Sequence, residues 1–261
     1  MMKKSNSRNR ADADRAYTYL AQYYDLLMDI DYHKWVTYLE RIWQGFGIKA
    51  VKILELACGT GNITIPLAQK GYQVTAVDCS KAMIDKAKKK AEDAELQIEF
   101  IEHDMRTLSV EDQFDVVLCC CDSLNYLTEI WDLSAFFKQA YVHTKPGGLL
   151  LFDLNSEMKL REIYGNQFYA ELGDDFSYFW DNNFDEQTEI CRMELTFFIH
   201  LDNNLYQRVS EIHFEKLWRP QTIFNYLQAN NWQVMGYYGF LTWEEPGSDE
   251  ERWQFAARKE V

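Results

Sequence analysis

The feature that most constrains this chain is a regular alternation of apolar runs and amphipathic segments through residues 51–154. The apolar runs predict strands, and the segments between them carry apolar residues at helical spacing. Near-continuous apolar strands separated by helices are typical of a parallel sheet buried on both faces. The predicted strands are 51–57, 73–78, 97–104, 114–121 and 147–154, and the predicted helices are 63–71, one that Ser80 caps, and 129–142.

The segments on either side of this alternation have different patterns. Residues 17–46 predict two helices that are broken near Asp29-Ile30-Asp31, and residues 176–218 alternate with period two. The second pattern predicts an antiparallel insertion that turns at Asp202-Asn203-Asn204. A helix at 220–231 and strands at 233–239 and 253–259 then close the main sheet. The expected organisation is a disordered leader over 1–16, a core with a helical cap over 17–175, the insertion over 176–218, and the end of the core over 219–261.

Charge and cysteine content make several functions less favourable. The formal charge is 27 − 41 = −14, which disfavours nucleic acid as a partner. The one basic patch, Lys86 with Lys88, Lys89 and Lys90, is read as the solvated face of a helix. None of the six cysteines forms a C-x-x-C pair, so no metal site is predicted and the thiols are expected to be reduced. The polar N-terminus and the lack of a membrane-length apolar run predict a cytoplasmic protein.

A glycine turn follows the first predicted strand, and acids end the strands around it. The turn reads ILELACGTGN, with Glu55 just before it; Asp78 and Asp104 end the next two strands. Asp78 follows Gly61 by 17 residues, a spacing at which an acid accepts from ribose hydroxyls. Asp104 suits the exocyclic amine of adenine. Glu55 would repel a phosphate but suits an ammonium group, so the three acids together favour S-adenosylmethionine as the cofactor.

At this point the sequence resembles a family. ELACGTGN, VDCSKAMIDKA, HDM, FDVVLCCCDSLNY and KPGGLLLFD are similar, in order and spacing, to the motifs of class I S-adenosylmethionine-dependent methyltransferases. The resemblance covers about residues 17–261 and is nearest to small bacterial enzymes of the methyltransferase 11/25 type. It implies an α/β, Rossmann-like fold with N-terminal helices and a seven-stranded, mostly parallel sheet. The implied strand order is 3-2-1-4-5-7-6 with the last strand antiparallel.

The resemblance also implies roles for individual residues. Residues 57–62 would lie against the methionine part of the cofactor, with Ala57 where many members have glycine. Asp78 would bind the ribose, Asp104 and Met105 the adenine, and Cys121 and Asp122 would border the methyl group. The candidate cofactor residues are Tyr17, Tyr24, Glu55, Ala57, Cys58, Gly59, Gly61, Asn62, Asp78, Cys79, Met83, Asp104, Met105, Cys121 and Asp122.

Structural roles are the alternative for several of these residues. Asp78 also suits a helix entry, since acids favour helix N-termini. Asp104 also suits a loop, Glu55 a strand end, and Tyr17 and Tyr24 the packing between helices.

The sequence assigns no catalytic residue, because a sulfonium is a good leaving group and methyl transfer mainly needs an aligned nucleophile. His213 is a candidate base that shares a strand face with Glu211. Trp180 and His213 are candidates for acceptor binding, with core packing as the alternative reading.

The insertion is predicted to be a lid whose polar face, with Arg192, Glu194, Thr196 and His200, meets a small-molecule acceptor. Three alternatives stay open: a methyltransferase of RNA or protein, a cofactor-binding module without catalysis, and an insertion that serves as an oligomer interface. The basic residues that a macromolecular substrate would need in the insertion are Arg192, Arg208 and Arg219. The sequence does not define the oligomeric state.

Overall fold

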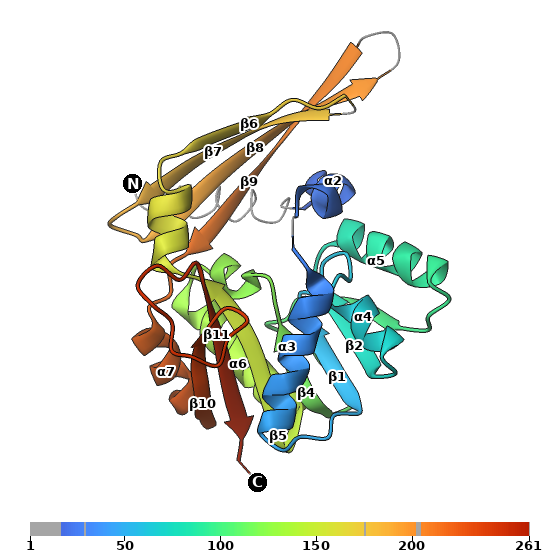
Figure 1. Ribbon diagram of the computed structural model, residues 1–261, viewed down its shortest axis with the longest axis vertical. Helices are drawn as coiled ribbons and strands as arrows, with labels where there is room; N and C mark the ends of the chain where they lie inside the picture. Colours follow the sequence, from blue (N-terminus) through green and yellow to red (C-terminus); the bar gives the residue numbers. More distant parts are fainter. Residues whose placement is uncertain (1–16, 29, 175, 202–204, 261) are drawn as a thin grey trace.

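The chain folds around two sheets in a computed structural model that describes residues 17–28, 30–174, 176–201 and 205–260 (Figure 1). The predicted leader, 1–16, and the predicted turn at 202–204 lie outside the described residues. A seven-stranded sheet with helices on both faces forms the core. Its strands are β1 (Lys52–Leu56), β2 (Gln73–Asp78), β3 (Glu99–Glu102), β4 (Phe114–Cys119), β5 (Thr144–Asn155), β10 (Trp232–Gly239) and β11 (Arg252–Lys259).

The strand order of the core sheet is β3-β2-β1-β4-β5-β11-β10. Strands β1 to β5 are parallel, whereas β11 runs antiparallel to both β5 and β10. This is the order that the family resemblance implies, so the predicted fold is confirmed. The carboxyl ends of the parallel strands meet at one edge of such a sheet, and ligands of this class of fold bind beyond that edge.

Helices cover both faces of the core sheet because its strands are apolar on both sides. On one face α3 (Tyr32–Gly45) and α4 (Thr64–Gln69) pack over Ile53 and Val116; on the other α6 (Ile130–His143) and α7 (Pro220–Ala229) pack over Leu54 and Val117. α5 (Lys81–Asp93) is capped by Ser80, whose hydroxyl accepts from the Met83 N–H. No described helix is long and apolar enough to cross a membrane.

The N-terminal helices take the positions at which the sequence predicts them. α2 (Leu20–Leu27) and α3 are separate, and the Asp31 carboxylate caps α3 by accepting from the Lys34 N–H. α2 lies between α5 and the second sheet (Figure 1). It can therefore contact both halves of the molecule.

The second sheet projects beyond the core (Figure 1) and has the order β6-β7-β8-β9. Its strands are β6 (Phe168–Glu171), β7 (Phe176–Asp185), β8 (Ile190–Leu201) and β9 (Leu205–Lys216), all antiparallel. The sequence predicts the antiparallel region from 176 onward. The sheet itself begins earlier, with β6, and a short π-helix, η2 (Met158–Tyr164), joins it to the core. The sequence pattern does not predict β6, because its four residues lack an apolar alternation and all four are exposed.

Candidate active site

The glycine turn after β1 is held in place by the acid at the end of β2. Asp78 accepts the Gly59 N–H at 2.8 Å and the Ser80 N–H at 2.8 Å. Burial raises the pKa of Asp78, although these two N–H groups oppose the shift. Ala57, Gly59 and Gly61 all have positive φ, and a Cβ placed on Gly59 would meet no atom within 4 Å. The turn therefore leaves open space in front of Gly59, where a ligand can approach the backbone.

Glu55 lies beneath this turn. Its side chain is buried and accepts a short hydrogen bond from the Thr64 hydroxyl at the start of α4. Burial raises the pKa of Glu55 to about 8, against the opposing effect of Thr64. A buried carboxyl group of this kind ionises more readily when a cation approaches and is disfavoured beside a phosphate. The acceptors of this site therefore fit the ammonium and hydroxyl donors of S-adenosylmethionine.

The third acid has a partner that the sequence analysis missed. Asp104 accepts from the backbone N–H of Arg106 at 2.8 Å and from its guanidinium, which also binds Asp132 at 2.9 Å. Burial favours the neutral acid, but the hydrogen bonds from Arg106 hold the pKa of Asp104 below its usual value. Met105 packs against the main core at the same turn. Both readings of Asp104, loop acid and adenine acceptor, are compatible with this geometry.

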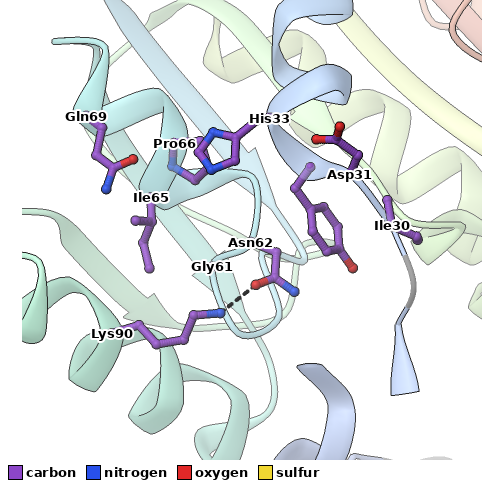
Figure 2. Close-up of a pocket in the computed structure, with 10 residues that line it drawn as sticks. Ile30, Asp31, His33, Gly61, Asn62, Ile65, Pro66, Gln69 and Lys90 are labelled. Carbon is purple, nitrogen blue, oxygen red and sulfur yellow. Dashed lines mark hydrogen bonds between the residues drawn. The ribbon is translucent and has the colours of Figure 1, made fainter. Parts of the chain in front are cut away.

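α2 docks on the glycine turn through one acid. Asp25 accepts from Thr60 at 2.6 Å, from Asn62 at 2.8 Å and from Lys90 at 2.8 Å. Lys90 also donates to the Asn62 side chain, as Figure 2 shows. Lys90, part of the predicted solvated patch, therefore anchors the turn and is not simply a surface charge.

A hollow of about 310 Å³ lies between this turn and the start of α3 (Figure 2). It shares Gly61 and Asn62 with the predicted cofactor residues. The predicted acids Glu55, Asp78 and Asp104 do not line it. The hollow is therefore a neighbour of the glycine turn and not the whole of a cofactor site.

The start of α2 connects the core to the second sheet. Glu211 of β9 accepts the backbone N–H groups of Tyr17, Tyr19 and Leu20. The Ser80 hydroxyl donates to the Tyr17 carbonyl at 3.5 Å, and the Tyr17 and Tyr24 rings lie 6.1 Å apart. The two predicted tyrosines thus lie together, beside the end of β2.

The end of β4 is shaped by an ion-pair network that joins distant segments. Cys121 and Asp122 both have positive φ, and the Asp153 carboxylate accepts both of their backbone N–H groups at 2.9 Å. Arg252 binds Asp153 and also Asp122, the latter at 2.7 Å. The predicted methyl-border residues are thereby fixed at the carboxyl ends of β4 and β5.

One face of the second sheet turns toward these strand ends, and we call it the inner face. His213 and Glu211 lie on it side by side, with His213 Nε2 3.3 Å from Glu211 Oε2 and His213 Nδ1 3.2 Å from the Tyr126 hydroxyl. Tyr126 belongs to the short 3-10 helix η1 (Ser123–Tyr126), just after β4. The pairing that the sequence predicts between His213 and Glu211 is therefore present, and both side chains are buried.

Two further inner-face residues were not found from the sequence. Glu215, two positions beyond His213 on β9, accepts from Asn155 Nδ2 at 2.7 Å at the end of β5. Asn182 of β7 lies in register with Met193 and, through it, with His213. Trp180, a predicted acceptor-binding residue, lies on the same face, with its ring 5.7 Å from that of Tyr164. We call Trp180, Asn182, His213 and Glu215 the inner-face cluster.

The expectation that the polar face of the insertion meets the acceptor is wrong. Arg192 and Glu194 pair with each other at 2.7 Å on the outer face, where both side chains are more than a third exposed. Arg219, which follows β9 and is a candidate contact for a macromolecular substrate, is likewise bound to carboxylates, those of Glu157 and Glu189. The error arose because alternation identifies two faces but not which of them packs on the core; here the apolar face carries Glu211, His213 and Glu215 inward.

The remaining candidate cofactor residues are Met83, Cys58 and Cys79. Met83 is buried in α5, Cys58 is buried in the turn, and Cys79 is exposed. The Cys58 N–H donates to the Val77 carbonyl, which ties the turn to β2. All six cysteines are free thiols.

Comparisons with known proteins agree with this geometry. Residues 53–148 match the family model described as Methyltransferase domain. The chain is 35% identical to the protein named "Putative methyltransferase YqeM" of Bacillus subtilis over 93% of this chain and 97% of that one. A crystal structure of an S-adenosylmethionine-dependent methyltransferase from Clostridium acetobutylicum superposes with a TM-score of 0.85 at 30% identity, covering 94% and 99% of the two chains.

A more distant structure shares the fold. CalS10 of Micromonospora echinaspora, an amino pentose methyltransferase solved with S-adenosylmethionine bound, has a TM-score of 0.70 at 17% identity, covering 92% of this chain and 96% of that one. The chain described here belongs to the class I S-adenosylmethionine-dependent methyltransferase family.

Proposed function

We propose that this methyltransferase acts on a small molecule held between the carboxyl ends of β4 and β5 and the inner face of the second sheet. The observation that carries the proposal is the inward position of the inner-face cluster. Its His213 contacts η1 after β4, and its Glu215 contacts the end of β5. Buried polar side chains at the ligand-binding edge of an α/β sheet are the usual setting of a small-molecule site.

The cofactor is assigned to the other side of the same edge. S-adenosylmethionine supplies an activated methyl group. Asp78 keeps the Gly59 turn in place and would accept from the ribose hydroxyls, while Glu55 would pair with the ammonium group. Tyr17 and Tyr24 cover the site, and Glu211 holds this cover by accepting its N–H groups. These residues align the reactants and exclude water, which is most of what methyl transfer requires.

The charges of the second sheet support a small acceptor over RNA or protein. Of the three arginines in or just after the second sheet that a macromolecular substrate would need, Arg192 and Arg219 are bound to carboxylates and Arg208 is exposed. The whole chain carries a formal charge of −14. A phosphate-rich substrate would meet few free cations here. That CalS10 is an amino pentose methyltransferase agrees with a small acceptor for this fold.

The test is to measure S-adenosylhomocysteine formation when the protein is incubated with S-adenosylmethionine and a cell extract. We expect activity with the small-molecule filtrate of the extract and none with the retained macromolecules. Activity confined to the retained fraction, and lost after nuclease or protease treatment, would reject a small acceptor.

A further inference from the structure

The second sheet carries a buried carboxylate without a cation. Glu215 is 2% exposed, and among the described residues its side chain has one hydrogen-bond donor, Asn155. The two cations that act on it are bound elsewhere: Arg252 to Asp122 and Asp153, and Lys159 to Glu251 at 2.7 Å. A buried carboxylate is costly unless a cation or several donors compensate it.

The surroundings of Glu215 add negative charge. Burial raises the pKa of Glu215 well above its usual range, Asp122 raises it further, and Asn155 opposes the shift. A cation that binds beside Glu215 would lower this pKa, ionise the carboxyl group and pair with the resulting carboxylate. A positively charged ligand would therefore supply the compensating charge that the described residues do not provide for Glu215.

Other polar groups of the same region also lack partners. Among the described residues, both polar atoms of the Asn182 amide, Trp180 Nε1 and Asn155 Oδ1 are buried without a hydrogen bond, and Asn182 is 3% exposed. Native proteins leave few such groups unpaired, and a cluster of them in one region is explained by a functional site that a ligand completes. The rings of Tyr164 and Trp180, 5.7 Å apart, add π faces that favour a cation.

We propose that the acceptor is a small primary or secondary amine with a neighbouring hydroxyl or amide group. Glu215 binds the nitrogen, and Asn182 binds the neighbouring polar group. This inference rests on the proposed function and specifies the substrate class of the same site.

The reaction balances with groups already present. The ammonium passes one proton to the Glu215 carboxylate, and the freed lone pair on nitrogen attacks the methyl carbon. The N–C bond forms as the C–S bond breaks, and the electron pair of the C–S bond stays on sulfur as a neutral thioether. The product is a methylated ammonium, and Glu215 later returns its proton to solvent.

The first test compares two carboxylates of the second sheet. Glu215→Gln keeps the shape and the hydrogen bond from Asn155, and Glu194→Gln on the outer face is the matched control. With the filtrate as acceptor source, Glu215→Gln is expected to lower kcat/KM at least about tenfold, with S-adenosylhomocysteine affinity unchanged. Asn182→Ala should mainly raise the apparent KM. Unchanged kinetics in both Glu215→Gln and Asn182→Ala would overturn the proposal.

The second test needs no variant. The filtrate is treated with acetic anhydride, which blocks amines, and then with hydroxylamine, which removes esters from hydroxyls. Methyl transfer should disappear after this treatment and persist in a mock-treated sample. Transfer that survives acetylation would reject the amine while leaving the small-molecule methyltransferase intact. A lack of transfer to either sample would instead count against the proposed function.

Discussion

The two sheets of this protein build their halves of the proposed site in different ways. In the core sheet, Asp78 binds Gly59 and Ser80, which lie 19 and 2 residues away, and Glu55 binds Thr64, 9 residues away. In the second sheet, the Tyr126–His213 and Asn155–Glu215 contacts join residues 87 and 60 positions apart. The proposed cofactor half follows from local sequence, whereas the proposed acceptor half exists only once the two sheets pack together.

The two halves also differ in how far their polar groups are satisfied. The acids of the cofactor half all accept hydrogen bonds from the chain. The described part of the acceptor half keeps several buried polar atoms without partners. A half-site that binds a single cofactor can have its polar groups satisfied before the cofactor binds. We infer that the polar groups of the acceptor half are satisfied only when the acceptor binds.

The largest effect is expected at Asp78. Asp78→Ala removes the acceptor for the ribose and also releases the Gly59 and Ser80 N–H groups. Hydrogen bonds to a charged group contribute roughly 1.5–3 kcal/mol each. S-adenosylmethionine affinity, measured by calorimetry, should fall at least about tenfold. Unchanged affinity in a variant that melts like the parent would break the assignment of the cofactor to the core sheet.

The next effect concerns pH and isolates Glu55. Its folded pKa of about 8 exceeds the ordinary value of 4.5, so the unfolded chain loses this proton first as pH rises. The contribution of Glu55 to the free energy of unfolding is at its maximum below about pH 4.5 and falls until the pH passes about 8. Between about pH 5 and 7 the cofactor-free protein should lose on the order of 2 kcal/mol from Glu55.

Glu55→Gln is the control, because it mimics the protonated acid and cannot ionise. Denaturant titrations at several pH values should give a shallower pH dependence for this variant than for the parent. If the free energy of unfolding depends on pH equally in both proteins, burial does not raise the pKa of Glu55, and the argument for a cationic ligand beside it fails.

A smaller effect is expected where the two halves meet. Glu211→Ala removes the acceptor for three N–H groups at the start of α2 while leaving the core sheet untouched. Amide exchange over residues 19–27 should accelerate, and S-adenosylhomocysteine should dissociate several-fold faster. Glu194→Ala, on the outer face of the same sheet, should change neither. Equal exchange rates in the two variants would show that Glu211 does not hold the cover closed.

The smallest effect is expected at Ala57, a residue with a side chain at a φ of 56°. A left-handed alanine costs roughly 1–2 kcal/mol, partly offset by the greater chain entropy of glycine in the unfolded state. Ala57→Gly should therefore stabilise the protein by less than about 1 kcal/mol. A loss of stability in thermal melts would show that the turn is not strained at this residue.

Much of the core was predictable because its signals are local. The strand at 73–78 has the predicted bounds, and the helix capped by Ser80 follows from that local signal. The helix predicted at 220–231 is present over Pro220–Ala229. The strand order came from the family resemblance and not from periodicity. Strand ends that carry acids were visible for the same local reason.

The acceptor half was less predictable because it depends on packing. Asp122 and Arg252 are far apart in the sequence, and no local pattern pairs them. Glu215 had a usable signal, since it continues the alternation of Glu211 and His213 on one strand face. Asn182 had none, because an isolated asparagine in a strand does not indicate which sheet face is buried.

The most direct test of this division is a crystal structure with S-adenosylhomocysteine bound. The account predicts ribose hydroxyls within hydrogen-bonding distance of Asp78, and a sulfur atom beside Cys121 and Asp122 that faces His213 and Glu215. A ligand whose ribose is remote from Asp78, or whose sulfur points away from the second sheet, would contradict it.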